Sequence, residues 1–176
     1  MIENGNLPAA RFLETLHTVH RDGTHLVYSW SRVFSQGINT AWVLSLNSNP
    51  QRAEALEAFV SRFGRMQDTI AGKLLPRWLL ALAEAPGTQI ETLNRAERLG
   101  VIEDVQPWLE ARNLRNRLIH EYASLPEDFA ADLILAQGYT PMLMSVYNKV
   151  RRFAVERMGL EEANLPGPLA LPEQTP

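Results

Sequence analysis

Four polar side chains close together in the chain could perform chemistry as a group. They are Arg115, Asn116, His120 and Tyr122. Helix-forming residues surround them, and a helix turns by roughly 100° per residue. Asn116 and His120 therefore lie on one polar strip, and Arg115 and Tyr122 point in nearly the same direction beside it. This spacing predicts that one helix presents a guanidinium, an amide, an imidazole and a phenol around a shared arc.

These groups suit the chemistry of phosphodiesters. A guanidinium binds phosphate through a planar fork that is always charged, and an imidazole titrates near neutrality and transfers protons. An amide can fix the imidazole or a sugar hydroxyl. RNA supplies its own nucleophile, the 2′-hydroxyl, so this set requires neither a metal ion nor a cofactor. The candidate catalytic residues are Arg115, Asn116 and His120. The alternative, that they are ordinary solvated or capping groups, stays open.

The elements that must position these residues are all expected to be helices. Leu, Ala, Glu and Arg recur throughout, and Val, Ile and Thr never form the alternating runs typical of strands. Asn49 before Pro50, and Thr88 with Glu91, are start signals of helices. Long helices joined by short turns predict an all-α fold, an antiparallel up-and-down bundle of four to six helices. The motif helix is expected at about residues 104–122.

Prolines and glycines suggest where these helices bend or stop. Pro76 is expected to bend or break the long helix that begins at Pro50, and Gly138 with Pro141 to interrupt the last helical region. One helical domain is expected over residues 1–160. After Leu165, four prolines in the tail of residues 161–176 exclude a helix and leave little that could pack. This tail is predicted to be disordered or to depend on a partner.

Composition restricts the class of protein. The chain of 176 residues is 45% hydrophobic, enough for a real core. It has no cysteine, which excludes disulfides and thiolate metal sites and favours a reducing compartment. No signal pattern and no apolar run near the roughly 20 residues of a membrane span is present. We therefore expect a soluble, cytoplasmic protein that does not enter a membrane.

Other candidate sites have simpler explanations. His17, His20 and His25 lack a carboxylate that would complete a metal site, so we expect surface histidines. The four tryptophans could stack on bases, but their helical spacing with other apolar residues favours the core. The chain lacks a phosphate-binding glycine loop and a nucleophile elbow, and it lacks the Gly-Ser and paired aspartates of a nucleotidyltransferase.

The ordered string Arg-x4-His-x-Tyr, with Asn directly after Arg, resembles the signature of the HEPN superfamily. More narrowly, it is similar to the HepT-type toxins, which pair with minimal nucleotidyltransferase (MNT) antitoxins. The resemblance covers the motif tightly and residues 51–158 more loosely, and residues 62–68 are similar to the family's preceding long helix. It implies a HEPN-like bundle that dimerises with two motifs facing each other across a cleft. Arg115, Asn116 and His120 would form the active centre, and the partner could attach AMP to Tyr122.

Two functions follow as expectations. The first is a metal-independent RNase toxin, an endoribonuclease that acts as a homodimer and is neutralised by an MNT antitoxin, with AMPylation of Tyr122 as one route. The second is a non-catalytic substrate-binding or regulatory partner subunit of a nucleotidyltransferase. The net charge of −3 favours the second, because RNA-binding proteins are usually more basic, although binding depends on local charge.

Overall fold

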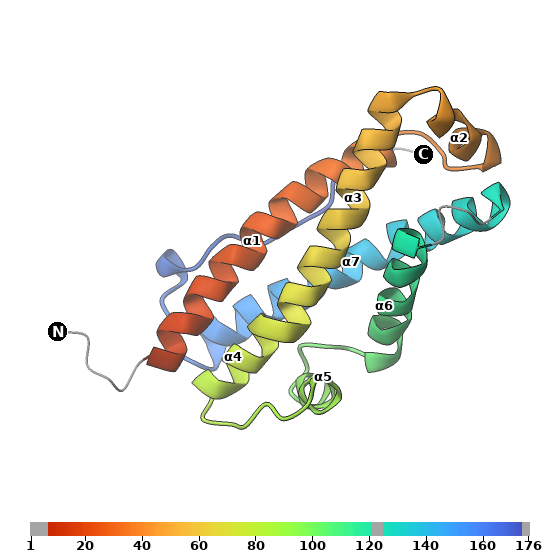
Figure 1. Ribbon diagram of the computed structural model, residues 1–176. Helices are drawn as coiled ribbons and strands as arrows, with labels where there is room; N and C mark the ends of the chain where they lie inside the picture. The colour runs from red at the N-terminus through yellow and green to blue at the C-terminus, as the bar shows by residue number, and fades with distance from the viewer. Residues whose placement is uncertain (1–6, 121–124, 174–176) are drawn as a thin grey trace.

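The computed structural model describes residues 7–120 and 125–173, and within these ranges the chain forms helices and no strand (Figure 1). The predicted all-α bundle is therefore confirmed. The helices are α1 (Leu7–Val33), α2 (Thr40–Leu44), α3 (Pro50–Thr69), α4 (Leu75–Ala81), α5 (Gln89–Arg98), α6 (Val105–His120) and α7 (Pro126–Glu156). A π-helical turn, Ile70–Leu74, joins α3 to α4, and short 3-10 turns lie at Ser45–Asn47 and Glu162–Asn164.

Local sequence signals determine where two of these helices begin. The Asn49 side chain accepts a hydrogen bond from the backbone N–H of Arg52, and Pro50 follows it at the start of α3. Thr88 and Glu91 form a reciprocal capping box at the start of α5. Both starts were predicted, because each needs only residues that are neighbours in the chain.

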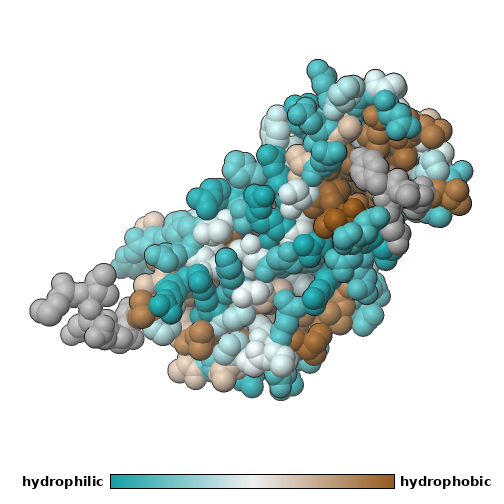
Figure 2. Space-filling model, in the orientation of Figure 1, coloured by the Kyte–Doolittle hydropathy of each residue, from teal (hydrophilic) through white to brown (hydrophobic). Residues whose placement is uncertain are grey.

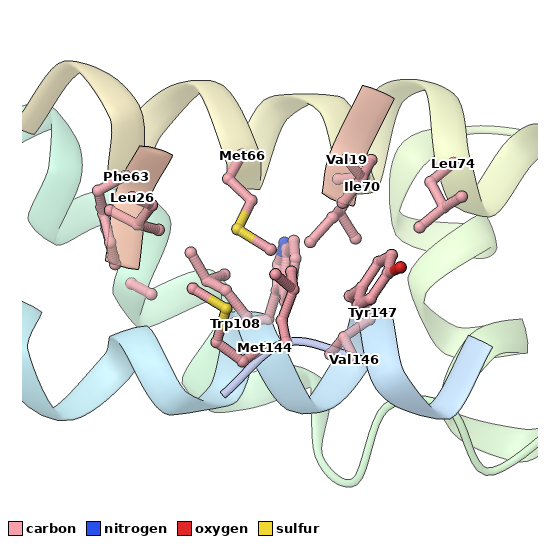
Figure 3. Packing of buried hydrophobic residues seen from close by; sticks show 14 of the residues in the cluster. Val19, Leu26, Phe63, Met66, Ile70, Leu74, Trp108, Met144, Val146 and Tyr147 are labelled. Carbon is pink, nitrogen blue, oxygen red and sulfur yellow. The ribbon is translucent and has the colours of Figure 1, made fainter. Parts of the chain in front are cut away.

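The core lies where α1, α3 and α7 meet. α1 runs antiparallel to α3 and packs along α3 and α4, and α7 crosses behind them (Figure 1). Side chains of α3, among them Phe63 and Met66, point toward Met144 and Tyr147 of α7, and Trp108 reaches the same core from α6 (Figure 3). All four tryptophans are buried, as predicted. They are Trp30, Trp42, Trp78 and Trp108.

Helix α6, which carries the motif, is fixed to this core along one face. Trp108, Ala111, Leu114 and Leu118 recur at helical spacing and are buried. The buried amide of Gln67 on α3 also donates to the backbone carbonyl of Trp108, at 3.2 Å. These contacts set the rotation of α6, and hence the direction in which each motif side chain leaves the helix.

The prolines within the helical regions do not interrupt them. α7 is continuous through Gly138 and Pro141, so the predicted interruption is wrong. Pro141 cannot donate to the carbonyl of Gln137, and the indole N–H of Trp30 donates to that carbonyl instead, at 3.4 Å. At Pro76 the helix is not broken either, but a π-helical turn precedes it, in which the N–H of Leu75 reaches the carbonyl of Ile70.

Within its described residues, the Pro-rich segment makes defined contacts with α7, although little in it was expected to pack. Tyr147 donates to the carbonyl of Gly167 at 2.8 Å, and Asn148 exchanges two hydrogen bonds with the backbone of Leu169 at 2.8 and 2.9 Å. Arg151 donates to the carbonyl of Pro166. A helix was correctly excluded after Leu165, but side chains of α7 bind the backbone of the extended segment, and Leu165 and Leu169 are buried in the core.

We predict that Leu169→Ala lowers the free energy of unfolding by about 2 kcal/mol. Leu169 is 7% exposed, and its Cδ1 occupies the space beside Gly23 in which a Cβ would come within 2.2 Å. The loss should appear as a lower denaturant midpoint in urea unfolding followed by circular dichroism. The exposed Leu80 serves as a control, since Leu80→Ala should change the midpoint little. Equal midpoints for the two variants would contradict the packing of this segment.

No helix in the described part of the chain combines the length and the apolar character needed to cross a membrane.

Candidate active site

Helix α6 places the predicted residues at different depths. Asn116 and His120 are exposed, and His120 is the last residue of the helix. Arg115 is half-buried, with 24% of its side chain exposed, and it points toward α3. Tyr122 lies outside the described residues, so its predicted position is not tested.

The guanidinium of Arg115 is held by α3. Its Nη1 donates to Oδ1 of Asp68 at 3.0 Å, and its Nη2 pairs with Oδ2 at 2.8 Å, which is the geometry of a two-point ion pair. Gly64, one turn earlier on α3, provides the space for the side chain, because a Cβ there would lie 2.8 Å from Nε of Arg115. The Nε atom itself is buried and has no hydrogen-bond partner. Arg115 is therefore fixed in direction before any ligand arrives.

A groove of about 410 Å³ opens beside Arg115 between α3 and α6. Its walls are mainly apolar, and hydrophobic side chains gather beside the upper half of α3 in Figure 2. The lining residues are Leu56, Glu57, Val60, Ser61, Gly64, Arg115, Leu118 and Ile119. Ile119 is 46% exposed although it lies between the buried Leu118 and the exposed His120. Because Ile119 is apolar, its exposed surface beside the groove is poorly solvated.

The groove contains Arg115 but neither Asn116 nor His120. Arg115 and His120 are five positions apart, so their directions from the helix axis differ by roughly 140°. The expected shared arc is thus divided: Arg115 faces α3, whereas Asn116 and His120 face outward. Within one chain, the guanidinium of Arg115 and the imidazole of His120 therefore lie on different faces of one helix.

Sequence reasoning missed the residues that orient the motif. Asp68 and Gly64 fall within residues 62–68, a stretch noted only for its likeness to a family helix. The motif residue Arg117 also has a defined role, because its Nε and Nη2 donate to Asp132 of α7 at 3.1 and 2.8 Å. This pair fixes the end of α6 to α7 near His120. One sequence signal could have indicated Asp68, namely a carboxylate at helical spacing after Gly64. This signal is weak without the structure.

The histidines of α1 do not join this site. Over residues 7–120 and 125–173, no group of three or more side chains from His, Cys, Asp and Glu is arranged to hold a metal ion. His17 and His25 are exposed, and His20 is half-buried beside the ring of Tyr147, with the ring centroids 6.0 Å apart. Burial, together with the charges of His17 and Arg151, lowers the pKa of His20. His20 is therefore a packed side chain of the α1–α7 contact.

Gly64→Ala tests whether the direction of Arg115 matters. The new Cβ would push Nε from its position, so any reaction that needs this guanidinium should slow by roughly 10- to 100-fold. Stability should not fall in parallel, because alanine favours a helix over glycine by about 1 kcal/mol. Gly138→Ala in α7 is the matched control, since nothing lies within 4 Å of its added Cβ. Similar activity of both variants in a phosphodiester cleavage assay would exclude a role for this orientation.

Comparisons of the chain with protein-family models, with curated proteins and with solved structures find no match.

Proposed function

We propose that this protein is a metal-independent ribonuclease toxin of the HEPN/MNT type. The observation that carries the proposal is the guanidinium of Arg115, which Asp68 and Gly64 hold in place one turn before the exposed imidazole of His120. A fixed cation that binds phosphate and an exposed group that carries a proton are the two groups that a phosphodiester transfer requires. The resemblance of residues 115–122 to the HEPN signature is the reason for proposing RNA as the substrate.

The reaction would use groups of the RNA and of the protein only. The 2′-oxygen forms a bond to phosphorus as the bond from phosphorus to the 5′-oxygen breaks, which leaves a 2′,3′-cyclic phosphate and a 5′-hydroxyl. His120 accepts the proton of the 2′-hydroxyl or delivers one to the leaving oxygen. Arg115 stabilises the charge that develops on the phosphate, and Asn116 orients the reacting groups. Arg115 would exchange its ion pair with Asp68 for an ion pair with the arriving phosphate.

A homodimer would complete this site. One chain offers one motif histidine, whereas an acid and a base on opposite sides of the phosphate need two. The division between Arg115 and His120, and the exposed Ile119 beside the groove, both suit a second copy placed against α6 around a two-fold axis.

We expect Ile119→Asp to convert a dimer into a monomer, because it places a charge in an apolar contact. Light scattering at micromolar concentration measures the mass directly. Ile134→Asp is a matched control on α7, since Ile134 is similarly exposed but does not line the groove. A wild-type chain that is already monomeric would contradict the dimer.

The activity itself is tested with the purified chain, single-stranded RNA and a chelator. Cleavage should persist in the chelator and yield 2′,3′-cyclic phosphate ends. Cleavage that stops when metal is removed would refute the mechanism.

The competing function is a non-catalytic partner subunit of a nucleotidyltransferase. The pairing of Arg115 with Asp68 favours it, since a guanidinium engaged by a carboxylate within its own chain also serves a structural purpose. Expression in a bacterial host separates the two functions. Growth arrest that Arg115→Ala abolishes supports the toxin, whereas no arrest, together with binding to a nucleotidyltransferase, supports the partner subunit.

Regulation through Tyr122 is part of the proposal and rests on the sequence alone. The phenol oxygen would attack the α-phosphate of ATP on the MNT partner, forming AMP-tyrosine and releasing pyrophosphate. The attached phosphodiester is an anion that could occupy Arg115 and repel RNA phosphate. Mass spectrometry of the co-expressed chain should find AMP on Tyr122. A Tyr122→Phe variant that is still neutralised by AMP transfer would exclude this residue.

A further inference from the structure

A second groove lies on the other side of α3, between α3 and α1. It has two adjoining parts, of about 500 Å³ and about 190 Å³, that share Arg32, Gln51 and Ala55 in their walls. The larger part adds Tyr28, Ser29 and Arg62, and the smaller part adds Trp42 and Arg52. In the space-filling view, hydrophilic side chains predominate over the upper half of α1 (Figure 2). This groove, which we call the α1–α3 groove, is unlike the apolar groove beside Arg115.

Three guanidinium groups line the α1–α3 groove, and their partners are neutral. Arg62 donates to the hydroxyl of Ser29 at 2.6 Å and to the carbonyl of His25 at 3.2 Å. Arg52 donates to the hydroxyl of Ser45 at 2.6 Å and to the side-chain oxygen of Gln36 at 3.2 Å. Arg32 donates to the phenol of Tyr28 at 3.1 Å.

None of these three arginines forms an ion pair within the described part of the chain, in contrast to Arg115 and Arg117. Glu54 is the one carboxylate among the lining residues. The groove therefore carries a local positive charge on a chain whose net charge is −3. Positive charge concentrated in a concave surface attracts anions more strongly than the same charge on a flat one.

An exposed aromatic ring adds a second kind of contact. Tyr28 is 59% exposed, which is unusual for a tyrosine on a packed helix, and the guanidinium of Arg32 lies 5.8 Å from its ring centroid. The hydrogen bond and the ring contact together hold the ring at the wall of the groove. Arginines beside an accessible aromatic ring are the combination that binds single-stranded nucleic acids, since the arginines take phosphates and the ring takes a base.

We propose that the α1–α3 groove binds single-stranded RNA at a distance from the cleavage site. Arg32, Arg52 and Arg62 contact phosphates, and Tyr28 stacks on a base. An acidic segment of a protein partner would satisfy the arginines but would leave the ring of Tyr28 without a function, so RNA fits the groove better. The proposal rests on the proposed function for its choice of RNA.

The α1–α3 groove and the cleavage site share helix α3. Arg62 lines the groove, and Gly64, which contacts Arg115, follows two residues later, roughly 160° around α3 on its other side. Gln51, at the other end of the groove, is about 20 Å from Gly64 at the rise of a helix. A strand bound along this groove would thus extend the enzyme's contact with RNA by several nucleotides. Long substrates should use both regions, and very short ones only the cleavage site.

The binding test uses a fluorescein-labelled oligouridine of about 20 nucleotides, followed by anisotropy in the His120→Ala background so that the RNA stays intact. Tyr28→Ala combined with Arg32→Ala should weaken binding roughly tenfold. The slope of log K against log salt should also decrease by about 0.7, the contribution of one phosphate contact on a single strand. Both side chains are exposed, so the fold should persist. Arg98→Ala, at an exposed site on α5, is the control and should bind as the parent chain does.

The outcomes separate the groove from the catalytic function. With His120 intact, the double variant should cleave the dinucleotide UpU as the wild type does and long RNA more weakly at limiting concentration. Weaker binding of oligouridine by the double variant supports the groove even if no RNA is ever cleaved. Unchanged affinity and salt slope would overturn it, even if cleavage itself is confirmed. Poly-glutamate that competes as well as oligouridine would also overturn it, because a protein partner would then be the better occupant.

Discussion

Replacing His120 by alanine is expected to lower the rate of RNA cleavage by about 10²- to 10⁴-fold while leaving the bundle folded. The imidazole is the group that the proposed mechanism uses to transfer a proton, and its removal leaves Arg115 and Asn116 only to bind and orient the phosphate. Because His120 is exposed at the end of α6, no packing is lost with it. The rate is measured with a single-stranded RNA in the presence of chelator, and the fold by circular dichroism.

His17→Ala provides the matched control, since His17 is also an exposed helical histidine but lies on α1, away from the motif. It should cleave RNA at the rate of the wild type. A His120→Ala variant that retains full activity would remove this residue from the mechanism. If both variants lose the same fraction of the cleavage rate, the loss has a cause other than proton transfer by His120.

The largest effect on stability is expected at Trp108. Its side chain is 1% exposed, and it reaches from α6 into the core formed by α3 and α7 (Figure 3). Trp108→Ala should lower the free energy of unfolding by about 3–5 kcal/mol, from lost burial and from the cavity that remains. The backbone carbonyl of Trp108 also accepts the amide of Gln67, so relaxation around the cavity would disturb the contact that orients α6. Activity should therefore fall with stability.

Denaturant unfolding with the far-ultraviolet signal of the helices measures this loss. The exposed Ile90 offers a control on α5, where Ile90→Ala should change stability by well under ~1 kcal/mol. If Trp108→Ala unfolds at the same denaturant concentration as this control, α6 is not anchored through Trp108. A second variant, Trp108→Phe, should recover part of the lost stability because it refills part of the cavity.

The sequence by itself determined the features that depend on neighbouring residues. Helical spacing of apolar residues predicted the all-α bundle and the burial of the four tryptophans, because a stripe at this period has to face a core. The starts of α3 and α5 were equally predictable, since Asn49 and Thr88 cap backbone groups within three residues. The motif also gave the types of side chain that this part of the chain carries, and therefore which chemistry to consider.

The tertiary structure alone decided how polar backbone groups without local partners are satisfied. Pro141 removes a hydrogen bond from α7, and from sequence this predicts a break, but Trp30 of α1 supplies the missing donor to Gln137. The backbone at Pro166 and Leu169 belongs to no helix, yet Asn148 and Arg151 of α7 bind it. In both cases the partner lies far away in the chain, and residue propensities carry no information about it.

The same reason applies to the candidate site. The spacing of Arg115 and His120 gives their angle around α6 but not the rotation of α6 against the bundle. Burial of Trp108 and Leu118 sets that rotation, and it turns Arg115 toward Asp68 and Gly64 of α3 while His120 faces outward. The chemistry of the groups could thus be predicted from the sequence. The sequence could not predict that Arg115 lines a groove while His120 lies on an open surface, because this depends on which helix packs beside each residue.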